Sequence, residues 1–242
     1  MVVVVDGKGS FRWTGLVIMA VIIALMVSCS RVTPSPSVQS SPVPESTPEF
    51  KPAPATADVS PGPTTRAEPP LLSYRDLGRF VNTDPATIDN SGFPITPVEE
   101  IHRTGTPRDV DINSYRLAVD GLVDHALSLS YQDLLQYAPL TRAVLLICPG
   151  FFVDNAEWTG VPVKTILSEA GLKPEAREVI FHSVDGYQQY FPLQDVLKDG
   201  VFLAYQVNGQ TLPREHGYPL QLVVQGAYGS KWAKWVNRVE VN

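Results

Sequence analysis

Cysteine is nearly absent from this chain, whose 242 residues contain only Cys29 and Cys148. Two cysteines exclude the disulfide framework that stabilises many small secreted domains. Cys29 ends an apolar N-terminal stretch, which leaves Cys148 without an obvious partner in the rest of the sequence. A lone cysteine is either a small buried hydrophobic residue or a thiolate that binds metal or attacks a substrate. Both interpretations of Cys148 are open at this point.

Positive charge is also scarce. Residues 71–242 contain 14 Lys and Arg against 20 Asp and Glu, which gives this part a net charge of −6. It has no arginine-rich run and no basic stripe. Proteins that bind nucleic acid need such positive charge to neutralise phosphates. We therefore expect no nucleic-acid partner.

No apolar run reaches the roughly 20 residues that a membrane-spanning helix needs. Residues 15–27 form an apolar run of 13, preceded by Lys8 and Arg12 and followed by Ser28 and Cys29. This pattern is typical of a bacterial lipoprotein signal, in which the cysteine becomes the lipidated first residue. We predict a signal peptide over residues 1–29, lipidation at Cys29 and an extracytoplasmic domain attached to the cell membrane. A retained single-pass anchor is the alternative.

Large apolar residues are sparse in residues 30–70, which hold 11 of the chain's 22 prolines among Ser, Thr and Ala. Such a segment buries too little surface to offset the entropy lost on ordering. We predict a disordered, Pro-rich linker over residues 30–70 that acts as an extended spacer. Residues 71–242 suffice for one domain with a sizeable core.

The patterns within this domain predict many short strands and few helices. Strands are expected at residues 115–120, 122–129, 142–148, 178–183, 189–192, 201–207, 221–224 and 236–241. Helices are expected at 131–135, 163–170 and 193–197, the first with a capping box formed by Ser130 and Asp133. We expect a loop after Cys148, in which Asp154, Asn155 and Glu157 face either the solvent or a substrate, and a turn at 159–162. Without regular βαβ alternation, the class is α+β, a β-rich single domain.

Three segments in a fixed order resemble one known family. The first comprises residues 119–123 and 127–134, Val-Asp-Gly-Leu-Val and Leu-Ser-Leu-Ser-Tyr-Gln-Asp-Leu. The second is Leu-Ile-Cys at 146–148, ten residues before Trp-Thr-Gly-Val-Pro-Val at 158–163. The third is Leu-Pro-Arg-Glu-His-Gly-Tyr-Pro-Leu at 212–220, followed by Ala-Tyr-Gly-Ser-Lys-Trp-Ala-Lys-Trp at 227–235.

Over residues 95–242 these segments resemble the molybdopterin-binding domain of the sulfite oxidase superfamily. The similarity is to its small, haem-free extracytoplasmic branch, typified by the catalytic subunit of periplasmic methionine sulfoxide reductase. The resemblance implies the mixed α+β sulfite oxidase fold and a molybdenum-molybdopterin cofactor. In this family one cysteine thiolate binds the molybdenum, and Cys148 matches that position. A soft thiolate suits the metal, and a lone cysteine then needs no partner.

The resemblance also implies which residues bind the pterin: His102, Arg103, Ser183, His216, Gln221, Trp232, Ala233 and Lys234. Four of them have a structural alternative. His102 and Arg103 are equally compatible with a solvated loop, Lys234 with an ordinary surface lysine, and Trp232 with the core. Asp185, Gly186 and Tyr187, with Tyr190, match a fold signature of the family that borders the mouth of the site.

The chain departs from the family pattern in three places. Sulfite oxidases carry an arginine-rich segment after the cysteine, whereas residues 149–153 here are apolar and uncharged. Sulfite, a dianion, would gain little from that wall, so a neutral sulfoxide-like substrate fits better. Gln221 stands where the family often has an arginine, which removes one phosphate clamp. The N-terminal segment lacks the arginine pair expected of a protein exported with its cofactor inserted.

The leading prediction is a membrane-tethered molybdenum oxidoreductase that transfers an oxygen atom to or from a small-molecule substrate. Electrons would pass to or from a redox partner protein. The chain ends soon after the third segment, so we expect a monomer without the dimerisation domain of sulfite oxidases. The alternative is a cofactor-free surface lipoprotein of the same fold that acts as a binding module. A thiol enzyme is the third possibility, but no histidine is evidently paired with Cys148.

Overall fold

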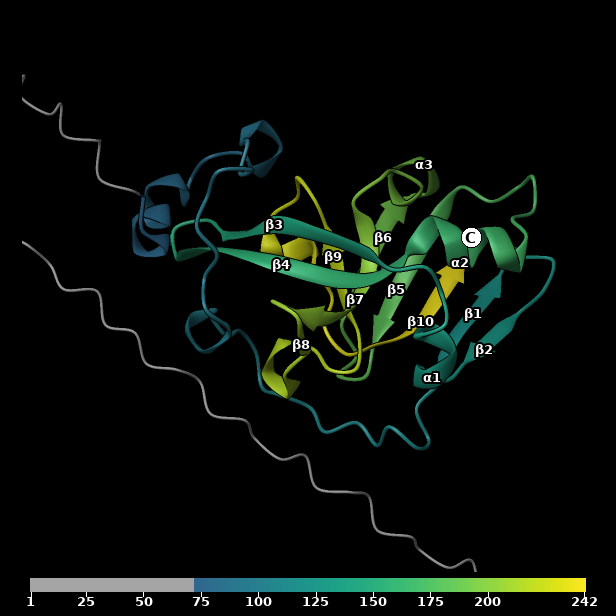
Figure 1. Ribbon diagram of the computed structural model, residues 1–242. Helices are drawn as coiled ribbons and strands as arrows, with labels where there is room; N and C mark the ends of the chain where they lie inside the picture. The colour runs from purple at the N-terminus through teal and green to yellow at the C-terminus, as the bar shows by residue number, and fades with distance from the viewer. Residues whose placement is uncertain (1–71) are drawn as a thin grey trace, which may run out of the picture. The chain divides into compact units, whose positions relative to one another are not determined.

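The structure, a computed structural model, describes residues 72–242 (Figure 1). The predicted signal peptide of residues 1–29, its lipidation site Cys29 and the predicted linker of residues 30–70 lie outside the described residues. None of the helices between residues 72 and 242 has the length and apolar character needed to cross a membrane.

One of the two five-stranded sheets contains the last strand of the chain at its centre. Its order is β2-β1-β10-β5-β6, and its strands are β1 (Leu117–Gly121), β2 (Leu127–Leu129), β5 (Glu178–Ser183), β6 (Gln188–Pro192) and β10 (Val236–Val241). Strand β10 pairs parallel with β1 and antiparallel with β5. All the other strand pairs in this sheet are antiparallel.

The second sheet carries the long hairpin on which the site is built. It has the order β3-β4-β7-β8, and β9 also pairs with β7. The strands are β3 (Leu140–Cys148), β4 (Phe152–Pro162), β7 (Val201–Val207), β8 (Gln210–Thr211) and β9 (Gln221–Val224). Strands β7 and β9 are buried along most of their length, because both faces of this part of the sheet are covered, and continuous apolar runs suit such strands.

Short helices pack against the strands of both sheets. The α-helices are α1 (Tyr131–Leu134), α2 (Val163–Ala170) and α3 (Leu193–Val196), and the 3-10 helices are η1 (Tyr74–Phe80), η2 (Pro85–Thr87), η3 (Val98–Glu100), η4 (Arg214–His216) and η5 (Gly229–Lys231). Helix α2 buries Ile166 and Leu167 against the core. Helix α1 begins with the predicted capping box, in which Ser130 and Asp133 each accept a backbone N–H from the other.

The predicted α+β, β-rich class is confirmed, and four of the predicted strands (178–183, 201–207, 221–224 and 236–241) and helix 163–170 have the predicted bounds. The loop and turn predicted after Cys148 are wrong. Residues Phe152–Pro162 form β4, which pairs with β3 from Cys148 back to Leu140. Asp154 and Asn155 are buried within it. Of the strand expected at 122–129, only Leu127–Leu129 forms.

The N-terminal segment, residues 72–102, explains how polar residues are accommodated in β4. Leu77 of η1 packs against Ile147 and Val153 of the hairpin. The side chain of Asn155 accepts a hydrogen bond from Asn90 (2.8 Å) and donates to the carbonyl of Phe93 (3.2 Å). Because these partners come from far away in the sequence, the strand is not visible in its local pattern.

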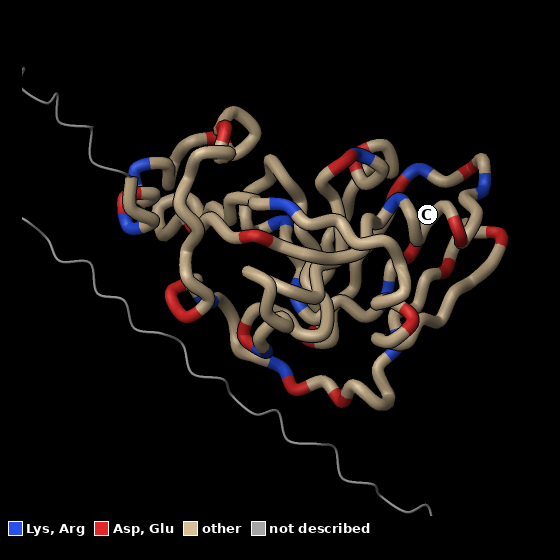
Figure 2. Tube along the Cα trace, in the orientation of Figure 1, with Lys and Arg blue, Asp and Glu red and all other residues tan. Residues whose placement is uncertain are grey.

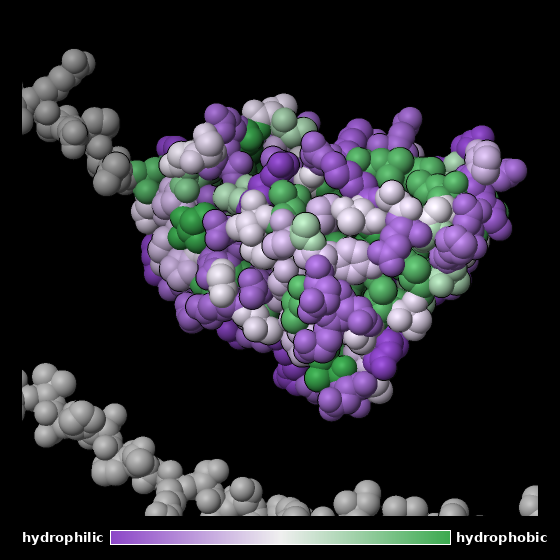
Figure 3. Space-filling view, turned by 45° about the vertical axis from the view of Figure 1, so that its right-hand side comes forward, coloured by the Kyte–Doolittle hydropathy of each residue, from purple (hydrophilic) through white to green (hydrophobic). Residues whose placement is uncertain are grey.

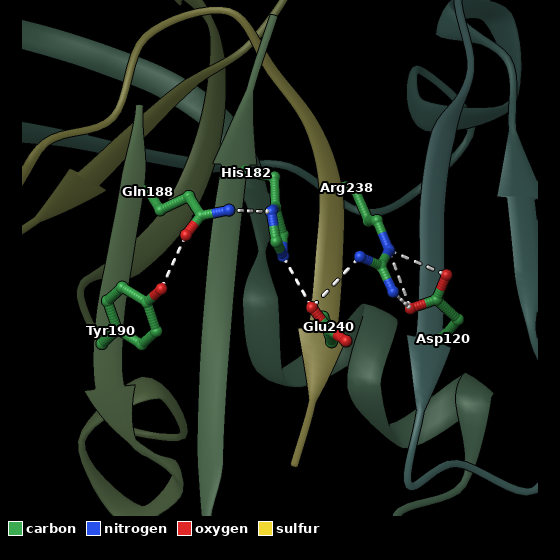
Figure 4. A network of polar contacts seen from close by, with 6 residues as sticks. All are labelled: Asp120, His182, Gln188, Tyr190, Arg238 and Glu240. Atoms are coloured by element: carbon green, nitrogen blue, oxygen red, sulfur yellow. Dashed lines mark hydrogen bonds and ion pairs between the residues drawn. The ribbon is translucent and has the colours of Figure 1, made fainter. Parts of the chain in front are cut away.

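Polar side chains form a ladder across four strands of the first sheet (Figure 4). Arg238 forms ion pairs with Asp120 (2.8 Å) and with Glu240 (3.1 Å), and Glu240 contacts the ring of His182 at 2.8 Å. The other ring nitrogen of His182 contacts Gln188 at 3.0 Å, and Gln188 accepts a hydrogen bond from Tyr190. The ladder ties β6, β5, β10 and β1 together in their register.

The surface of the domain is mixed in character. Acidic and basic residues are scattered among one another over residues 72–242 in Figure 2. On the face seen in Figure 3, hydrophobic residues form small patches between hydrophilic ones. The most exposed large hydrophobic side chain is Phe151, with 86% of its surface accessible.

Candidate functional site

Cys148 is the last residue of β3 and lies where the β3–β4 hairpin turns. Its thiol is free and half-buried, and its carbonyl accepts the N–H of Phe151 at 3.0 Å. Gly229, at the start of η5, packs directly against the sulfur. A Cβ atom at Gly229 would lie 3.0 Å from Sγ of Cys148 and 2.8 Å from Cδ1 of Leu146. The absence of a side chain at this position is therefore what lets η5 close over the thiol.

Two cavities meet at Cys148. The wider has a volume of 440 Å³ and is lined by Thr104, Gly105, Cys148, Pro149, Phe151, Asp185, Tyr187, Gly229, Ser230, Trp232, Lys234 and Trp235. The narrower has a volume of 20 Å³ and is lined by His102, Thr104, Leu146, Cys148, Phe152, His216, Gln221, Gly229, Trp232 and Lys234. The thiol thus faces both an open chamber and an enclosed recess.

The recess holds two buried polar atoms without partners. Nε2 of His216 and Oε1 of Gln221 find no hydrogen bond anywhere in the described part of the chain, although the two residues are only 2% and 1% exposed. Burial, and then the nearby charge of Lys234, lower the pKa of His216 to about 4. Unsatisfied buried polar atoms are rare in native proteins and call for a missing partner. A bound group that offers hydrogen-bond partners would satisfy both.

Lys234 lies at the junction of the two cavities. Its ammonium donates to the carbonyls of Thr104 (3.0 Å) and Glu215 (2.8 Å), and no carboxylate in residues 72–242 forms an ion pair with it. Burial lowers its pKa to about 8, against the opposing effects of Cys148 and Glu215. A partly desolvated ammonium with one hydrogen to spare is suited to hold an anionic group such as a phosphate.

His102 forms one wall of the recess and is fixed by Asp154 of β4. Asp154, with a side chain only 2% exposed, accepts both the backbone N–H of His102 (2.8 Å) and its ring Nδ1 (2.9 Å). The imidazole also stacks on Phe152, with ring centroids 4.5 Å apart. Burial raises the pKa of Asp154, while its hydrogen bonds to His102 lower it. The next residue, Arg103, lies outside both cavities and pairs with Glu215 at 3.6 Å.

The environment of the thiol opposes its ionisation. Burial and the charge of Asp154 raise the pKa of Cys148, and Lys234 only partly compensates. Reactive cysteines have a lowered pKa, because the thiolate is the nucleophile. A protonated, half-buried thiol is instead suited to a metal, which displaces the proton as it binds. The geometry therefore argues against a thiol enzyme.

The structure brings together most of the residues that the sequence predicts for the site. Cys148, His102, His216, Gln221, Trp232 and Lys234 all line the cavities. Ser183 ends β5 as predicted, but its buried hydroxyl lines neither cavity and has no partner among residues 72–242. Ala233 is fully buried, and its carbonyl accepts the N–H of Leu222. The indole N–H of Trp232 is bound to the carbonyl of Val224, so this side chain belongs to both core and cavity.

Several residues of the site were missed by the sequence analysis. Gly229, Thr104 and Gly105 carry no recognisable chemistry, and Asp154 was assigned to an exposed loop. Asp185 and Tyr187 do line the wider cavity, whereas Tyr190 belongs to the polar ladder of the first sheet. The one signal that indicated Gly229 was its place in the glycine-containing segment after His216.

Comparison with known proteins identifies the family. Residues 103–242 match the oxidoreductase molybdopterin binding domain. The chain is 34% identical over 152 residues to the uncharacterized oxidoreductase YuiH of Bacillus subtilis (strain 168), which covers 62% of this chain and 74% of that protein. It is 31% identical over 163 residues to human mitochondrial sulfite oxidase (55% of this chain, 30% of that protein).

Longer relatives share the same domain. The NADPH nitrate reductase of Beauveria bassiana is 28% identical over 201 residues, 72% of this chain but 21% of that protein. The crystal structure of the sulfane dehydrogenase SoxCD from Paracoccus pantotrophus superposes with a TM-score of 0.58 at 27% identity, over 74% of this chain and 55% of that one. The predicted sulfite oxidase fold, oxidoreductase class and molybdopterin cofactor are confirmed. The chain belongs to the oxidoreductase molybdopterin binding domain family, of the sulfite oxidase and nitrate reductase type.

Proposed function

We propose that the protein transfers an oxygen atom between a small, sulfoxide-like substrate and a molybdenum-molybdopterin group anchored at Cys148. The observation that carries the proposal is the position of Cys148, which lines both the recess with its unpaired polar atoms and the open chamber. The chamber has the room that a pterin group and a small substrate beside it need, and the recess adds buried polar atoms to its inner wall. When bound, the molybdenum-pterin group supplies the two-electron chemistry of the reaction.

The donor set fits the pterin group. Cys148 offers the soft thiolate that molybdenum prefers. His216 offers a ring nitrogen and Gln221 an amide oxygen, both without partners, to the polar atoms of the group, and Lys234 offers an ammonium to its phosphate. Gln221 replaces an arginine of the family pattern, so Lys234 is the one cation among the residues that line the recess.

The chamber favours a substrate without negative charge. Pro149, Phe151 and Tyr187 contribute apolar surface, and no arginine lines the cavity. In the reducing direction the S–O bond of a sulfoxide breaks and the sulfur gains two electrons, which a redox partner protein supplies. The oxygen leaves as water after taking up two protons. Lys234 is the one cation that lines the chamber, and with the pterin phosphate bound to it the two charges of sulfite would find little compensation.

Metal content tests the first part of the proposal. Wild-type protein and Cys148→Ala would be purified from a host that makes molybdopterin, and molybdenum and pterin measured in both. We expect about one molybdenum per chain in the wild type and loss of the metal in the variant. If both proteins are folded and neither contains molybdenum, the alternative of a cofactor-free binding module on the same fold is supported instead.

Substrate assays test the second part. The loaded protein would be given alkyl sulfoxides with a reduced dye as electron source, and sulfite with an oxidised dye. We expect turnover of the sulfoxides and little oxidation of sulfite. Efficient sulfite oxidation with no sulfoxide turnover would contradict the proposal.

We further propose that the protein is an extracytoplasmic monomer, tethered to the cell membrane by lipid at Cys29. The support is the sequence pattern that ends at Ser28 and Cys29. Cell fractionation and mass spectrometry of the mature N-terminus test it. Cys29→Ser should abolish the lipid adduct and processing, and unchanged mass and processing in this variant would contradict the proposal.

A further inference from the structure

We propose that Asp154 is a positioning residue of this site, which holds the ring proton of His102 on Nδ1 and so leaves Nε2 as a hydrogen-bond acceptor beside Cys148. This acceptor takes a hydrogen bond from an N–H or O–H of the group that is bound at the thiol. Because the role concerns that group, it rests on the proposed function. It follows from the way in which His102 lies over one face of the β3–β4 hairpin.

One face of the hairpin carries both the thiol and the side chains that hold His102. In the ladder Cys148 lies opposite Phe152, and Leu146 lies opposite Asp154. Side chains of directly opposed residues project to the same face of a sheet, about 5 Å apart. Side chains two positions apart along a strand also share a face. These four side chains therefore stand together on one face of the hairpin.

His102 covers the β4 side of this face. Its ring stacks on that of Phe152, with centroids 4.5 Å apart and planes 5° apart, and its Nδ1 lies 2.9 Å from Oδ1 of Asp154. His102, Phe152 and the thiol of Cys148 all line the recess, whereas Asp154 does not. A recess of 20 Å³ holds about one water molecule, so the residues that line it are close neighbours. Asp154 therefore reaches the recess only through His102.

The contacts of Asp154 favour one position of the ring proton. Its side chain is 2% exposed, and one carboxylate oxygen accepts the backbone N–H of His102 at 2.8 Å. The other oxygen faces Nδ1 and has no other donor among residues 72–242. A buried carboxylate oxygen without a donor is unfavourable, so Nδ1 carries the proton. In the neutral ring Nε2 is then an acceptor, and it has no hydrogen bond to any residue from 72 to 242.

This acceptor complements the other polar atoms of the recess. The buried Oε1 of Gln221 is a second acceptor without a partner in the described part of the chain, and Lys234 supplies an ammonium. A group that turns N–H or O–H toward this wall can be bound by both acceptors. If the proton of His102 were on Nε2 instead, the ring would present a donor to those same groups, and the hydrogen bond would be lost.

Nitrogen NMR of the pterin-free protein tests the position of the proton. The four histidines would be labelled with nitrogen-15 and measured at alkaline pH, where histidine is neutral, and His102→Gln would assign the signals. We expect the proton of His102 on Nδ1 in the wild type. In Asp154→Asn it should move to Nε2, because the asparagine oxygen must still accept the backbone N–H and its NH2 group then faces Nδ1. A wild type with the proton on Nε2 would overturn the inference, even if Asp154→Asn does not fold.

Glu157→Gln is the matched control, since it also changes an acid of β4 to its amide. Glu157 is exposed, lines neither cavity and lies on the opposite face of the strand from Asp154. The proton of His102 should stay on Nδ1 in this variant. A shift to Nε2 in both variants would overturn the inference, because it would mean that the effect does not come from the contact with Asp154.

Retention of the bound group tests the consequence. Loaded wild type, Asp154→Asn and Glu157→Gln would be dialysed, and the molybdenum and pterin that remain would be measured over time. We expect Asp154→Asn to lose both roughly tenfold faster than the other two, because a hydrogen bond is replaced by two facing donors. Equal rates would overturn the role of His102 toward the group. Absence of molybdenum from the wild type would overturn the proposed function alone, since the position of the proton is measured without it.

Discussion

Acid should destabilise the pterin-free protein through His216. The ordinary pKa of histidine, 6.5, applies to the unfolded chain, whereas burial lowers the pKa of His216 to about 4 in the folded protein. Between these two values the unfolded chain binds a proton that the folded protein does not. Stability therefore falls as the pH decreases from about 6.5 to about 4, and this contribution is fully present above pH 6.5.

The size of the effect follows from the two pKa values. Each unit of difference corresponds to about 1.4 kcal/mol, so the imidazole should remove about 2 kcal/mol of stability between pH 7 and pH 5, and about 3 kcal/mol by pH 4. Other groups titrate in the same range, among them Asp154, whose raised pKa acts in the opposite direction. Their effects are common to the wild type and to a variant in which only His216 is changed.

The assay is urea unfolding of wild type and His216→Gln, followed by tryptophan fluorescence at pH 7, 5 and 4. Both proteins would be made in a host that lacks molybdopterin, so that the recess is compared in one state. The free energy of unfolding of the wild type should fall by about 2 kcal/mol more than that of His216→Gln between pH 7 and pH 5. Parallel pH dependences would refute the reasoning, because they would mean that His216 is protonated as easily in the fold as in the unfolded chain.

Three further predictions concern the framework of the site. In Gly160→Ala the new Cβ would lie 2.0 Å from the carbonyl oxygen of Leu203 on β7, so we expect urea unfolding to show a loss of about 3 kcal/mol in the free energy of unfolding. The control Gly92→Ala, whose surroundings are open, should lose less than about 0.5 kcal/mol. Equal stabilities of the two variants would contradict the packing described. Gly229→Ala should crowd Sγ of Cys148 and lower the molybdenum content of the purified protein, while Gly92→Ala should load normally. Asp154→Ala removes the carboxylate that accepts both hydrogen bonds of His102. Since a hydrogen bond to a charged group contributes about 1.5–3 kcal/mol, the backbone amide of His102 should exchange its hydrogen roughly tenfold faster or more. Unchanged protection of this amide would show that other contacts hold the segment.

Local patterns in the sequence were sufficient for much of the fold. Strands β7 and β9 are continuous apolar runs, and α2 carries Ile166 and Leu167 on its buried face, so periodicity alone located them. Strand β4 was missed because its polar residues are satisfied by remote partners. Asp154 is bound by His102 and Asn155 by Asn90, more than 50 positions earlier in the chain. No local signal contains those contacts.

The candidate site was predictable only in part, and for a similar reason. Cys148 stood out by its chemistry, and His216 and Lys234 by their place in a family segment. The role of Gly229 in the site depends on how closely η5 approaches the sulfur of Cys148. The role of Asp154 depends on the pairing of β3 with β4. Both are properties of the assembled sheets, so they appear only once the strands are placed.

The central position of β10 has a consequence for how the domain folds. Residues of β10 pair with residues of β1 that lie about 120 positions earlier, as in the pairing of Ala118 with Arg238. The first sheet therefore cannot be completed until Val236–Val241 has been synthesised, and closing so long a loop slows folding. Until then β1 and β5 present unpaired edges that invite aggregation. Removing residues 236–242 should leave a chain that cannot fold, rather than a slightly shortened domain.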